Sequence, residues 1–189
     1  MSKGPLIILS GPSGSGKSTL IAEMLSRTNL PVRLSISATT RAARPLERDG
    51  VHYYFWSKVE FLEAIDQGRF LEWAEVHGHY YGTLLAEVEP FRNKGTGVIL
   101  DIDVQGARQV ASRFPEAVKV FLKTSTWEVY EQRIRRRGTE NEAAILRRLE
   151  TARRELACIG EYQFVVINDD EDLGSAVDQL LQTVQQSFV

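Results

Sequence analysis

The sequence predicts a three-layer α/β fold with a mostly parallel sheet. Short apolar runs, typical of strands buried on both faces, alternate with amphipathic helical patterns along the 189 residues. Strands that alternate with helices favour parallel pairing, because each helix carries the chain back to the same edge of the sheet. With 43% hydrophobic residues the chain can bury a sizeable core, and its length fits one domain with small insertions.

The composition also restricts the class of protein. The formal net charge of −2 gives no indication of a nucleic-acid or membrane surface. No apolar run is long enough for a membrane span, and the first strand begins too early to leave room for a signal peptide. The single cysteine, Cys158, cannot form an intrachain disulfide, and its apolar neighbours predict a core position. We therefore expect a cytoplasmic protein from a reducing compartment.

The first strand and the first helix enclose a glycine-rich loop. An apolar run at 6–9 predicts the strand, and a helical pattern follows at 17–28. Between them stands Gly-x-x-x-x-Gly-Lys-Ser, the P-loop pattern, whose glycines let successive backbone N–H groups turn towards one anion. The residues of this loop are Gly11, Pro12, Ser13, Gly14, Ser15, Gly16, Lys17 and Ser18.

This loop predicts a binding site for a nucleoside triphosphate. The helix that follows adds the positive end of its dipole and its unpaired N–H groups. Lys17 is expected to reach the outer phosphates, and the Ser18 hydroxyl to ligate Mg²⁺. The alternative is a glycine-rich turn without a ligand, which the flanking strand and helix disfavour.

The next part of the chain mixes short strands, loops and aromatic residues. Alternating apolar residues predict a strand at 32–36, and Ser57 with Glu60 forms a capping-box pattern before a helix that Gly68 ends. Pro90 predicts a break or kink in the helix around it. The other elements expected here are a loop at 38–50, strands at 51–55 and 70–76, an aromatic turn at 78–83 and a helix at 84–94.

The rest of the chain returns to regular alternation. A run at 98–102 that is apolar except for Asp101 predicts a buried strand, and its end carries Asp101 and Asp103, at the edge where parallel α/β sheets bind ligands. The later elements expected are a helix at 105–113, a strand at 118–122, helices at 126–137 and 141–158, a core strand at 164–167 and a closing amphipathic helix at 173–184.

The loop after the second strand carries candidates for a second phosphate site. Arg41 and Arg44 lie close to the Ser37 hydroxyl and suit a phosphate group through charge-assisted hydrogen bonds. The phenols of Tyr53 and Tyr81 are candidates to bind the same phosphate. The alternative is a solvated basic loop with two core tyrosines, and spacing alone leaves both open.

Two carboxylates at strand positions, Glu72 and Asp103, are candidates for recognising a base. Guanine presents neighbouring N–H donors at N1 and N2, which a carboxylate accepts and which adenine lacks. Ser37 and Thr83 are placed to donate to guanine O6. The alternatives are a solvent-facing position for Glu72 and turn chemistry at the strand end for Asp101 and Asp103.

The stretch 125–155 is rich in arginine and predicts a helical lid. Arg133 and Arg137 lie four apart on one helix face, and Arg148 follows on the next helix. Arginines that close over phosphates stabilise a transferring phosphoryl group and exclude water. The alternative is a solvated helix face paired with interleaved glutamates. Surface or loop positions without metal-ligand spacing are expected for His52, His77 and His79.

Over nearly its full length the chain closely resembles guanylate kinases. The resemblance rests on segments that share the motifs of that family. They are Leu-Ser-Gly-Pro-Ser-Gly-Ser-Gly-Lys-Ser (9–18), Ser-x-Thr-Thr-Arg-x-x-Arg (37–44), Asp-Gly-Val-x-Tyr-x-Phe (49–55), Tyr-Tyr-Gly-Thr (80–83), Leu-Asp-Ile-Asp-Val-Gln-Gly-Ala (100–107), Arg-Gly-Thr-Glu (137–140) and Ile-Asn-Asp-Asp (167–170).

The resemblance implies transfer of the γ-phosphoryl group of ATP to GMP, and also to dGMP, with Mg²⁺ as cofactor. GMP gives GDP and ATP gives ADP, a reaction of purine nucleotide metabolism and GMP recycling. The implied architecture has a P-loop NTPase core with a parallel sheet, a GMP-binding α+β insertion and a helical lid. The implied bounds are 1–37, 91–124 and 156–189 for the core, 38–90 for the insertion and 125–155 for the lid.

The resemblance also implies roles for the matching residues. The GMP phosphate would contact Arg41, Arg44, Tyr53 and Tyr81, and guanine would contact Ser37, Glu72, Thr83 and Asp103. ATP would contact the P-loop, with Asn168 near the adenine and Asp101 near Mg²⁺ and the phosphates. The catalytic residues would be Lys17, Arg41, Arg133, Arg137 and Arg148.

A few positions depart from the family pattern without removing a group that has a named role. They are Ala38, His52, Leu84 and the segment 123–125.

Two rival functions follow from the same residues. A related kinase for a phosphorylated sugar would not need Glu72 or the motif at 80–83. A non-catalytic scaffold that binds a phosphorylated protein segment would not need the intact P-loop. The oligomeric state stays open.

Overall fold

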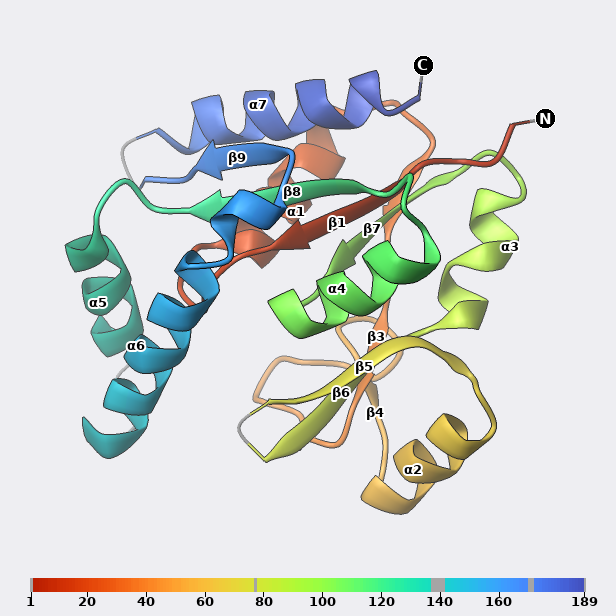
Figure 1. The fold of residues 1–189 in the computed structure, drawn as a ribbon, viewed down its shortest axis with the longest axis horizontal. Helices are drawn as coiled ribbons and strands as arrows, with labels where there is room; N and C mark the ends of the chain where they lie inside the picture. The colour runs from red at the N-terminus through yellow and green to blue at the C-terminus, as the bar shows by residue number, and fades with distance from the viewer. Residues whose placement is uncertain (1, 77, 137–141, 170–171, 189) are drawn as a thin grey trace. The chain divides into compact units, whose positions relative to one another are not determined.

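The computed structural model describes residues 2–76, 78–136, 142–169 and 172–188 (Figure 1). The chain divides into two compact units. The first comprises Met1–Leu6, Pro31–Leu100 and Gln105–Ala117, and the second comprises Ile7–Leu30, Asp101–Val104 and Val118–Val189. Among the described helices, none has both the length and the apolar composition needed to cross a bilayer.

The second unit is built on a parallel ladder. Strand β1 (Leu6–Ser10) pairs with β8 (Val118–Lys123), and β8 pairs with β9 (Phe164–Ile167). Every residue of β1 is buried, which explains the apolar run at 6–9; the strand ends in a buried serine, Ser10. Helix α7 (Leu173–Gln186) packs against β9 and against α1 (Lys17–Arg27), as Figure 1 shows. These elements confirm the strand and helix predictions, although three of the four β9 residues are exposed.

Two helices of the second unit pack on each other through a small apolar cluster. They are α5 (Trp127–Arg136) and α6 (Glu142–Leu156), and Ile134, Ile145 and Leu149 form the contact. The helix predicted to reach residue 158 ends at Leu156. The prediction of a core position for Cys158 is wrong, because the side chain lies beyond the helix, just before the short 3-10 turn η2 (Ile159–Glu161), and is only half-buried.

In the first unit, two strands continue the parallel α/β pattern. Strand β2 (Val32–Leu34) pairs in parallel with β7 (Gly97–Asp101), and helix α4 (Val104–Arg113) follows β7. The strand predicted at 32–36 is shorter than expected. Ser35 and Ile36 lie outside it and carry the chain into a second sheet.

This second sheet has four strands in the order β4-β3-β6-β5. They are β4 (Tyr54–Phe55), β3 (Ser37–Thr39), β6 (His79–Leu84) and β5 (Phe70–Val76). Strand β6 is antiparallel to both of its neighbours, whereas β4 is parallel to β3. The segment 51–53, predicted as a strand, instead forms a turn that ends at an isolated bridge between Asp49 and Tyr53.

One face of this sheet packs on helix α2 (Lys58–Asp66). The packed residues are apolar: Ala38, Phe61, Ala64, Phe70 and Leu84. The predicted capping box is present, since the Ser57 hydroxyl accepts from Glu60 N and the Glu60 carboxylate accepts from Ser57 N. Gly68, with φ of +64°, follows the helix as predicted.

The aromatic turn predicted at 78–83 is wrong, because residues 79–84 form strand β6. Gly82 caused the error, since glycine favours turns in a sequence. In the structure it is needed for close packing, because a Cβ there would lie 2.7 Å from the Phe70 ring and 2.9 Å from Glu72 O. This close approach coincides with a register shift between Phe70 and Glu72 of β5.

The helix predicted at 84–94 is interrupted, as Pro90 indicated. It consists of a 3-10 turn, η1 (Leu85–Glu87), and a short helix, α3 (Glu89–Arg92).

The Glu87 carboxylate accepts hydrogen bonds from Arg33 Nη2 at 2.7 Å and from Tyr54 OH at 2.9 Å. It also accepts from Ile36 N at 3.3 Å, so one carboxylate fixes the segment between β2 and β3.

Side chains of α4 cover the outer edge of β5. The Gln109 amide donates to Trp73 O at 2.7 Å and accepts from Trp73 N at 3.2 Å. Arg113 donates to the carbonyls of Phe70 and Leu71 at 3.2 and 2.9 Å. Side chains of a helix thus form the hydrogen bonds that a further strand would form.

Candidate active site

In the second unit, the P-loop ends in an uncapped helix N-terminus. Gly16 precedes α1 with φ of +90°, a backbone conformation that favours glycine. No side chain caps α1, and its first turn, which lies wholly within the described chain, contains no acidic residue. The N–H groups at this end are therefore available to an anion. The Lys17 ammonium lies beside the loop and donates to Gly11 O at 2.6 Å.

Asp101, at the end of β7, lies close to the start of α1. Its carboxylate accepts from Ser18 Oγ at 3.5 Å and is 3.9 Å from Lys17 Nζ. Burial raises the pKa of the Asp101 carboxyl, whereas the Lys17 charge and the Ser18 hydroxyl act in the opposite direction. These hard oxygen donors suit Mg²⁺, which is usually held by one or two protein ligands together with substrate phosphates. No larger cluster of three metal-binding side chains occurs among the described residues.

Two arginines and an asparagine surround the P-loop. Arg133 of α5 donates to the carbonyls of Gly14 and Ser15, each at 3.3 Å, and to Asn168 O at 3.0 Å. The Asn168 side chain donates to Ser15 O at 2.7 Å. Arg148 of α6 hydrogen-bonds Ser13 Oγ. The structure thus brings the predicted ATP-binding residues together. Arg137 lies outside the described residues.

A cavity of about 320 Å³ adjoins this loop. Its lining includes predicted residues and several that the sequence reasoning missed. The lining consists of Gly14, Gly16, Thr19, Arg133, Arg136, Asn168, Asp169 and Leu173. Thr19 directly follows the P-loop residue Ser18 in the sequence, and this adjacency could have predicted its place in the site. The cavity has room for part of a nucleotide next to the helix N-terminus.

Glu155 of α6 is a further charged group near the P-loop lysine that the sequence reasoning missed. Burial raises its pKa to about 7; the Lys17 charge opposes this shift, and the Asp103 charge adds to it. Asp103, predicted to read guanine, is half-buried and belongs to this second unit. In the sequence, Glu155 is indistinguishable from the other acidic residues of its arginine-rich helix.

In the first unit, three predicted guanine-binding residues lie side by side on the polar face of the four-stranded sheet. The register places Thr83 of β6 opposite both Ser37 of β3 and Glu72 of β5. Glu72 is 4% exposed, and its carboxylate accepts from Thr83 N at 2.8 Å. The buried Thr83 hydroxyl has no hydrogen-bond partner among the residues that the structure describes. The solvent-facing alternative for Glu72 is therefore wrong.

The predicted phosphate-binding groups also converge in the first unit. Arg41 lies with its guanidinium carbon 5.5 Å from the centroid of the Tyr53 ring and hydrogen-bonds the phenol of Tyr81. The two tyrosine rings meet edge to face, with centroids 6.1 Å apart. Arg44 follows on the same loop but is exposed. The Arg41 side chain is only 13% exposed and lies against two phenols, so the alternative of a solvated basic loop with two core tyrosines does not fit Arg41, although it still fits the exposed Arg44.

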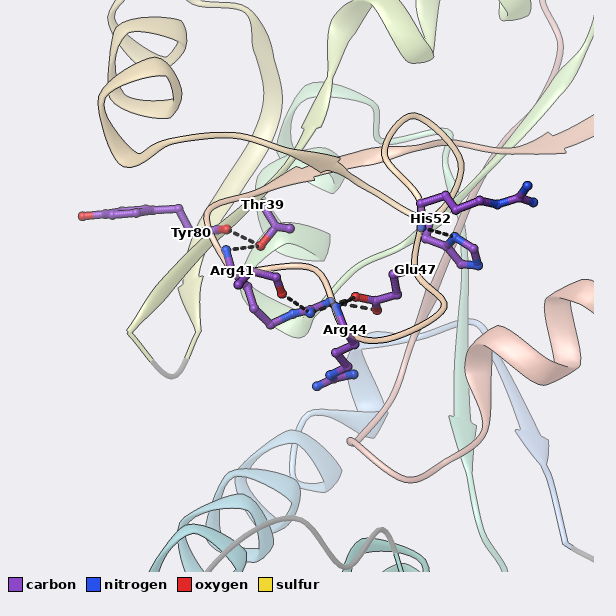
Figure 2. A network of polar contacts seen from close by, with 8 residues as sticks. Thr39, Arg41, Arg44, Glu47, His52 and Tyr80 are labelled. Carbon is purple, nitrogen blue, oxygen red and sulfur yellow. Dashed lines mark hydrogen bonds and ion pairs between the residues drawn. The ribbon is translucent and has the colours of Figure 1, made fainter.

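The sequence reasoning missed the partner of these arginines, Glu47. Its carboxylate forms an ion pair with Arg41 at 2.9 Å and accepts from Arg44 N at 2.7 Å (Figure 2). Burial lowers the pKa of the Arg41 guanidinium, but Glu47 and Tyr81 outweigh it and raise the pKa overall. The hydrogen bond from Arg41 lowers the pKa of Glu47. The only signal in the sequence was an acidic residue following two arginines.

The two described histidines carry no metal-binding arrangement. His52 is exposed, as predicted, and its Nδ1 accepts from Arg48 N at 3.1 Å (Figure 2). His79 is exposed too, but it lies in strand β6 and not in a loop. His77 lies outside the described residues.

The chain is similar to known proteins over nearly its whole length. A family model described as guanylate kinase matches residues 3–187. The chain is 52% identical over 178 residues to a guanylate kinase from Desulfitobacterium hafniense, an alignment that covers 94% of this chain and 87% of the relative. A guanylate kinase from Vibrio cholerae is 48% identical over 174 residues, which cover 92% and 84% of the two chains. The crystal structure of guanylate kinase from Anaplasma phagocytophilum superimposes with a TM-score of 0.81 at 30% identity, covering 100% of this chain and 88% of that one.

Proposed function

We propose roles for individual residues from the premise that this chain belongs to the guanylate kinase family and transfers the γ-phosphoryl group of ATP to GMP. The second unit binds ATP and the polar sheet face of the first unit binds GMP. The observation that carries this assignment is the cross-strand row of Ser37, Thr83 and Glu72, because it aligns hydroxyl donors with a buried carboxylate.

ATP binds at the P-loop. Its phosphates accept hydrogen bonds from the N-terminus of α1 and from Lys17, which leaves its bond with Gly11 O to reach them. Arg133 and Arg148 already lie on the loop and stabilise charge on the transferring group, together with Arg137. Asn168 holds the loop through Ser15 O.

Ser18 and Asp101 are the residues that would hold Mg²⁺. When bound, the ion neutralises part of the negative charge of the ATP phosphates. The residues present fit it, since both supply oxygen and neither is a soft ligand.

GMP binds on the polar sheet face, where the Glu72 carboxylate accepts from guanine N1–H and N2–H. The hydroxyls of Ser37 and Thr83 donate to guanine O6, and Asp103 also recognises the base. Arg41, Arg44, Tyr53 and Tyr81 bind the GMP phosphate through charge-assisted and phenolic hydrogen bonds. We propose that dGMP binds in the same way, since no group named here contacts the ribose 2′-hydroxyl.

The reaction is an in-line displacement at phosphorus. A GMP phosphate oxygen forms a bond to the γ-phosphorus of ATP, the bond to the β–γ bridging oxygen breaks, and its electron pair stays on ADP. The second pKa of a phosphate monoester is about 6, so the acceptor oxygen is anionic near pH 7. No general base is required, and the protein acts by positioning and by charge stabilisation.

We propose that the chain divides into a GMP-binding insertion (38–90), a lid (125–155) and a core formed by the remaining residues. We also propose that the enzyme is cytoplasmic. Closure of the insertion and the lid would exclude water from the phosphates. Small-angle scattering with and without a bisubstrate analogue should show compaction; unchanged scattering would contradict closure.

The central test is turnover across a panel of acceptors, followed as ADP release with GMP, dGMP, AMP, CMP, UMP and ribose bisphosphate. We expect turnover with GMP and dGMP. Turnover of AMP equal to that of GMP would refute guanine recognition by Glu72 and Asp103. Turnover of ribose bisphosphate alone would indicate a sugar-phosphate kinase. If calorimetry detects no affinity for ATP with Mg²⁺, the scaffold function is favoured.

A further inference from the structure

Glu47 is the one acidic side chain that binds both arginines of the GMP loop in the described part of the chain. Its two oxygens accept from Arg41 Nη1 at 2.9 Å and from Arg41 Nη2 at 3.0 Å, a bidentate end-on pair. The oxygen that faces Nη1 also accepts from Arg44 N at 2.7 Å. Both partners of the pair are largely buried, with side chains 13% and 16% exposed, so the contact is not a solvated surface pair.

The backbone of the loop is shaped to bring Glu47 back onto Arg41. A turn closes with a hydrogen bond from Glu47 N to Arg44 O at 3.0 Å. Leu46, inside this turn, has φ of +76°, which is uncommon for a residue with a side chain. Strained conformations of this kind persist where surrounding contacts impose them, and the bonds of Glu47 are such contacts.

The other end of the loop is attached to the sheet. Arg41 N donates to Thr39 Oγ1 at 3.2 Å, and the same hydroxyl donates to Tyr80 O at 2.9 Å (Figure 2). The backbone of Arg41 is thereby fixed to β3 and β6. Glu47 supplies what this attachment lacks, because it fixes the far end of the long Arg41 side chain.

The bonds to Glu47 leave part of the guanidinium for a ligand. Arg41 Nη1 donates to Glu47 and, at 2.7 Å, to Ala42 O, and Nη2 gives one of its hydrogens to Glu47. The Nε hydrogen and the second Nη2 hydrogen remain for Tyr81 and for a ligand. These two hydrogens lie on the side-on edge of the guanidinium. One of them serves the Tyr81 phenol, and the other is available to a phosphate oxygen.

We propose that Glu47 is a positioning residue for the acceptor phosphate. It holds the Arg41 guanidinium with its side-on edge turned to the phosphate, and it holds the Arg44 backbone in the turn beside it. GMP then binds without first ordering two long arginine side chains, an ordering that would cost affinity. This inference rests on the proposed function, because it assigns Glu47 to the GMP phosphate site.

The test compares GMP with guanosine, which carries the same base and no phosphate. Dissociation constants for both are measured by NMR titration with the wild-type chain and with Glu47→Ala, Glu47→Gln and Glu23→Gln. Glu23 is the matched control, since its carboxylate also accepts two bonds from an arginine, Arg27, on the surface of α1. Thermal melting of each variant shows whether it is folded.

We expect Glu47→Ala to raise the dissociation constant for GMP about tenfold and to leave the dissociation constant for guanosine unchanged. Glu47→Gln keeps one acceptor oxygen and should fall between wild type and Glu47→Ala, and Glu23→Gln should bind as wild type does. If Glu47→Ala is unfolded, the Gln variant alone decides, since a folded Gln variant with unchanged GMP affinity overturns the inference.

Three further results would overturn it. Tighter GMP binding by the Glu47 variants would mean that the carboxylate competes with the phosphate. An equal loss for GMP and guanosine would mean that Glu47 supports only the fold or the base site. A loss of GMP affinity in Glu23→Gln as large as in Glu47→Gln would mean that the effect is general. Failure of the wild-type chain to bind GMP would instead refute the proposed function itself.

Discussion

Replacing Thr83 by valine should change the stability of the free protein and its affinity for GMP in opposite directions. The Thr83 side chain has no exposed surface, and its hydroxyl finds no hydrogen-bond partner among the described residues. Valine has nearly the same shape but no hydroxyl. The substitution therefore removes a hydroxyl that lowers the stability of the free protein and that, in our assignment, donates a hydrogen bond to guanine O6.

The two magnitudes follow from the burial of this hydroxyl. A buried hydroxyl without a partner costs roughly 1–3 kcal/mol, so Thr83→Val should raise the free energy of unfolding by about 1 kcal/mol or more. One lost hydrogen bond to guanine O6 is worth about 1 kcal/mol, which corresponds to about fivefold weaker GMP binding. The hydroxyl is fully buried in this structure, so GMP can contact it only when the groups that cover it move. That movement costs free energy and reduces the net contribution of the hydrogen bond to GMP affinity.

Urea unfolding and GMP titration of wild type, Thr83→Val and Thr83→Ser test both signs. Serine retains the hydroxyl and is the control for side-chain size. A second ligand, 2-aminopurine riboside monophosphate, lacks O6, so its affinity should be the same in wild type and Thr83→Val.

Two results would refute the reasoning. If Thr83→Val unfolds more easily than wild type by 1 kcal/mol or more, the hydroxyl is satisfied in the free protein. If Thr83→Val binds GMP as tightly as wild type, or loses equal affinity for the ligand without O6, the hydroxyl does not recognise guanine O6.

Three other substitutions test separate parts of the structure. The pKa of Glu155 is raised from 4.5 to about 7 in the folded state, so the folded protein holds this proton more tightly than the unfolded chain, and stability falls as the pH rises through this window. Glu155→Gln should therefore gain stability relative to wild type by about 2 kcal/mol between pH 5 and pH 8 in urea titrations, and an equal difference at both pH values would contradict the shift. Asn168→Ala removes the hydrogen bond to Ser15 O and should lower the affinity for ATP about fivefold, as measured by calorimetry. The affinity for GMP is the control and should not change. Glu87→Gln leaves the acceptor of Tyr54 OH uncharged in a largely buried site and should lower the free energy of unfolding by roughly 1–3 kcal/mol; wild-type stability would show that the carboxylate is not needed there.

The parts of the fold that sequence reasoning predicted well depend on local chemistry. The capping box of Ser57 and Glu60, the break before Pro90 and the buried run of β1 each follow from residues that are adjacent in the sequence. Strand β6 was missed because Gly82 has the local signature of a turn. Its reason for being glycine is the close approach of Phe70 on a neighbouring strand, which no local pattern contains.

The candidate site divides in the same way. The P-loop is continuous in sequence, so its residues could be named from the pattern, and so could the arginines at 41 and 44. The row formed by Ser37, Thr83 and Glu72 depends on strand register, which their spacing alone did not give. Glu47 could not be found at all, because its contact with Arg41 depends on a left-handed residue in the loop between them.

The hydrogen bonds of Gln109 and Arg113 to β5 have a consequence for the behaviour of this protein at high concentration. An uncovered strand edge next to an exposed aromatic such as Trp73, which is 38% exposed, is a site where chains can pair and aggregate. Here two side chains of α4 hydrogen-bond the backbone of Phe70, Leu71 and Trp73 and protect this part of the edge without a further strand. The residues that protect this strand edge from pairing are therefore on a helix and not in the sheet.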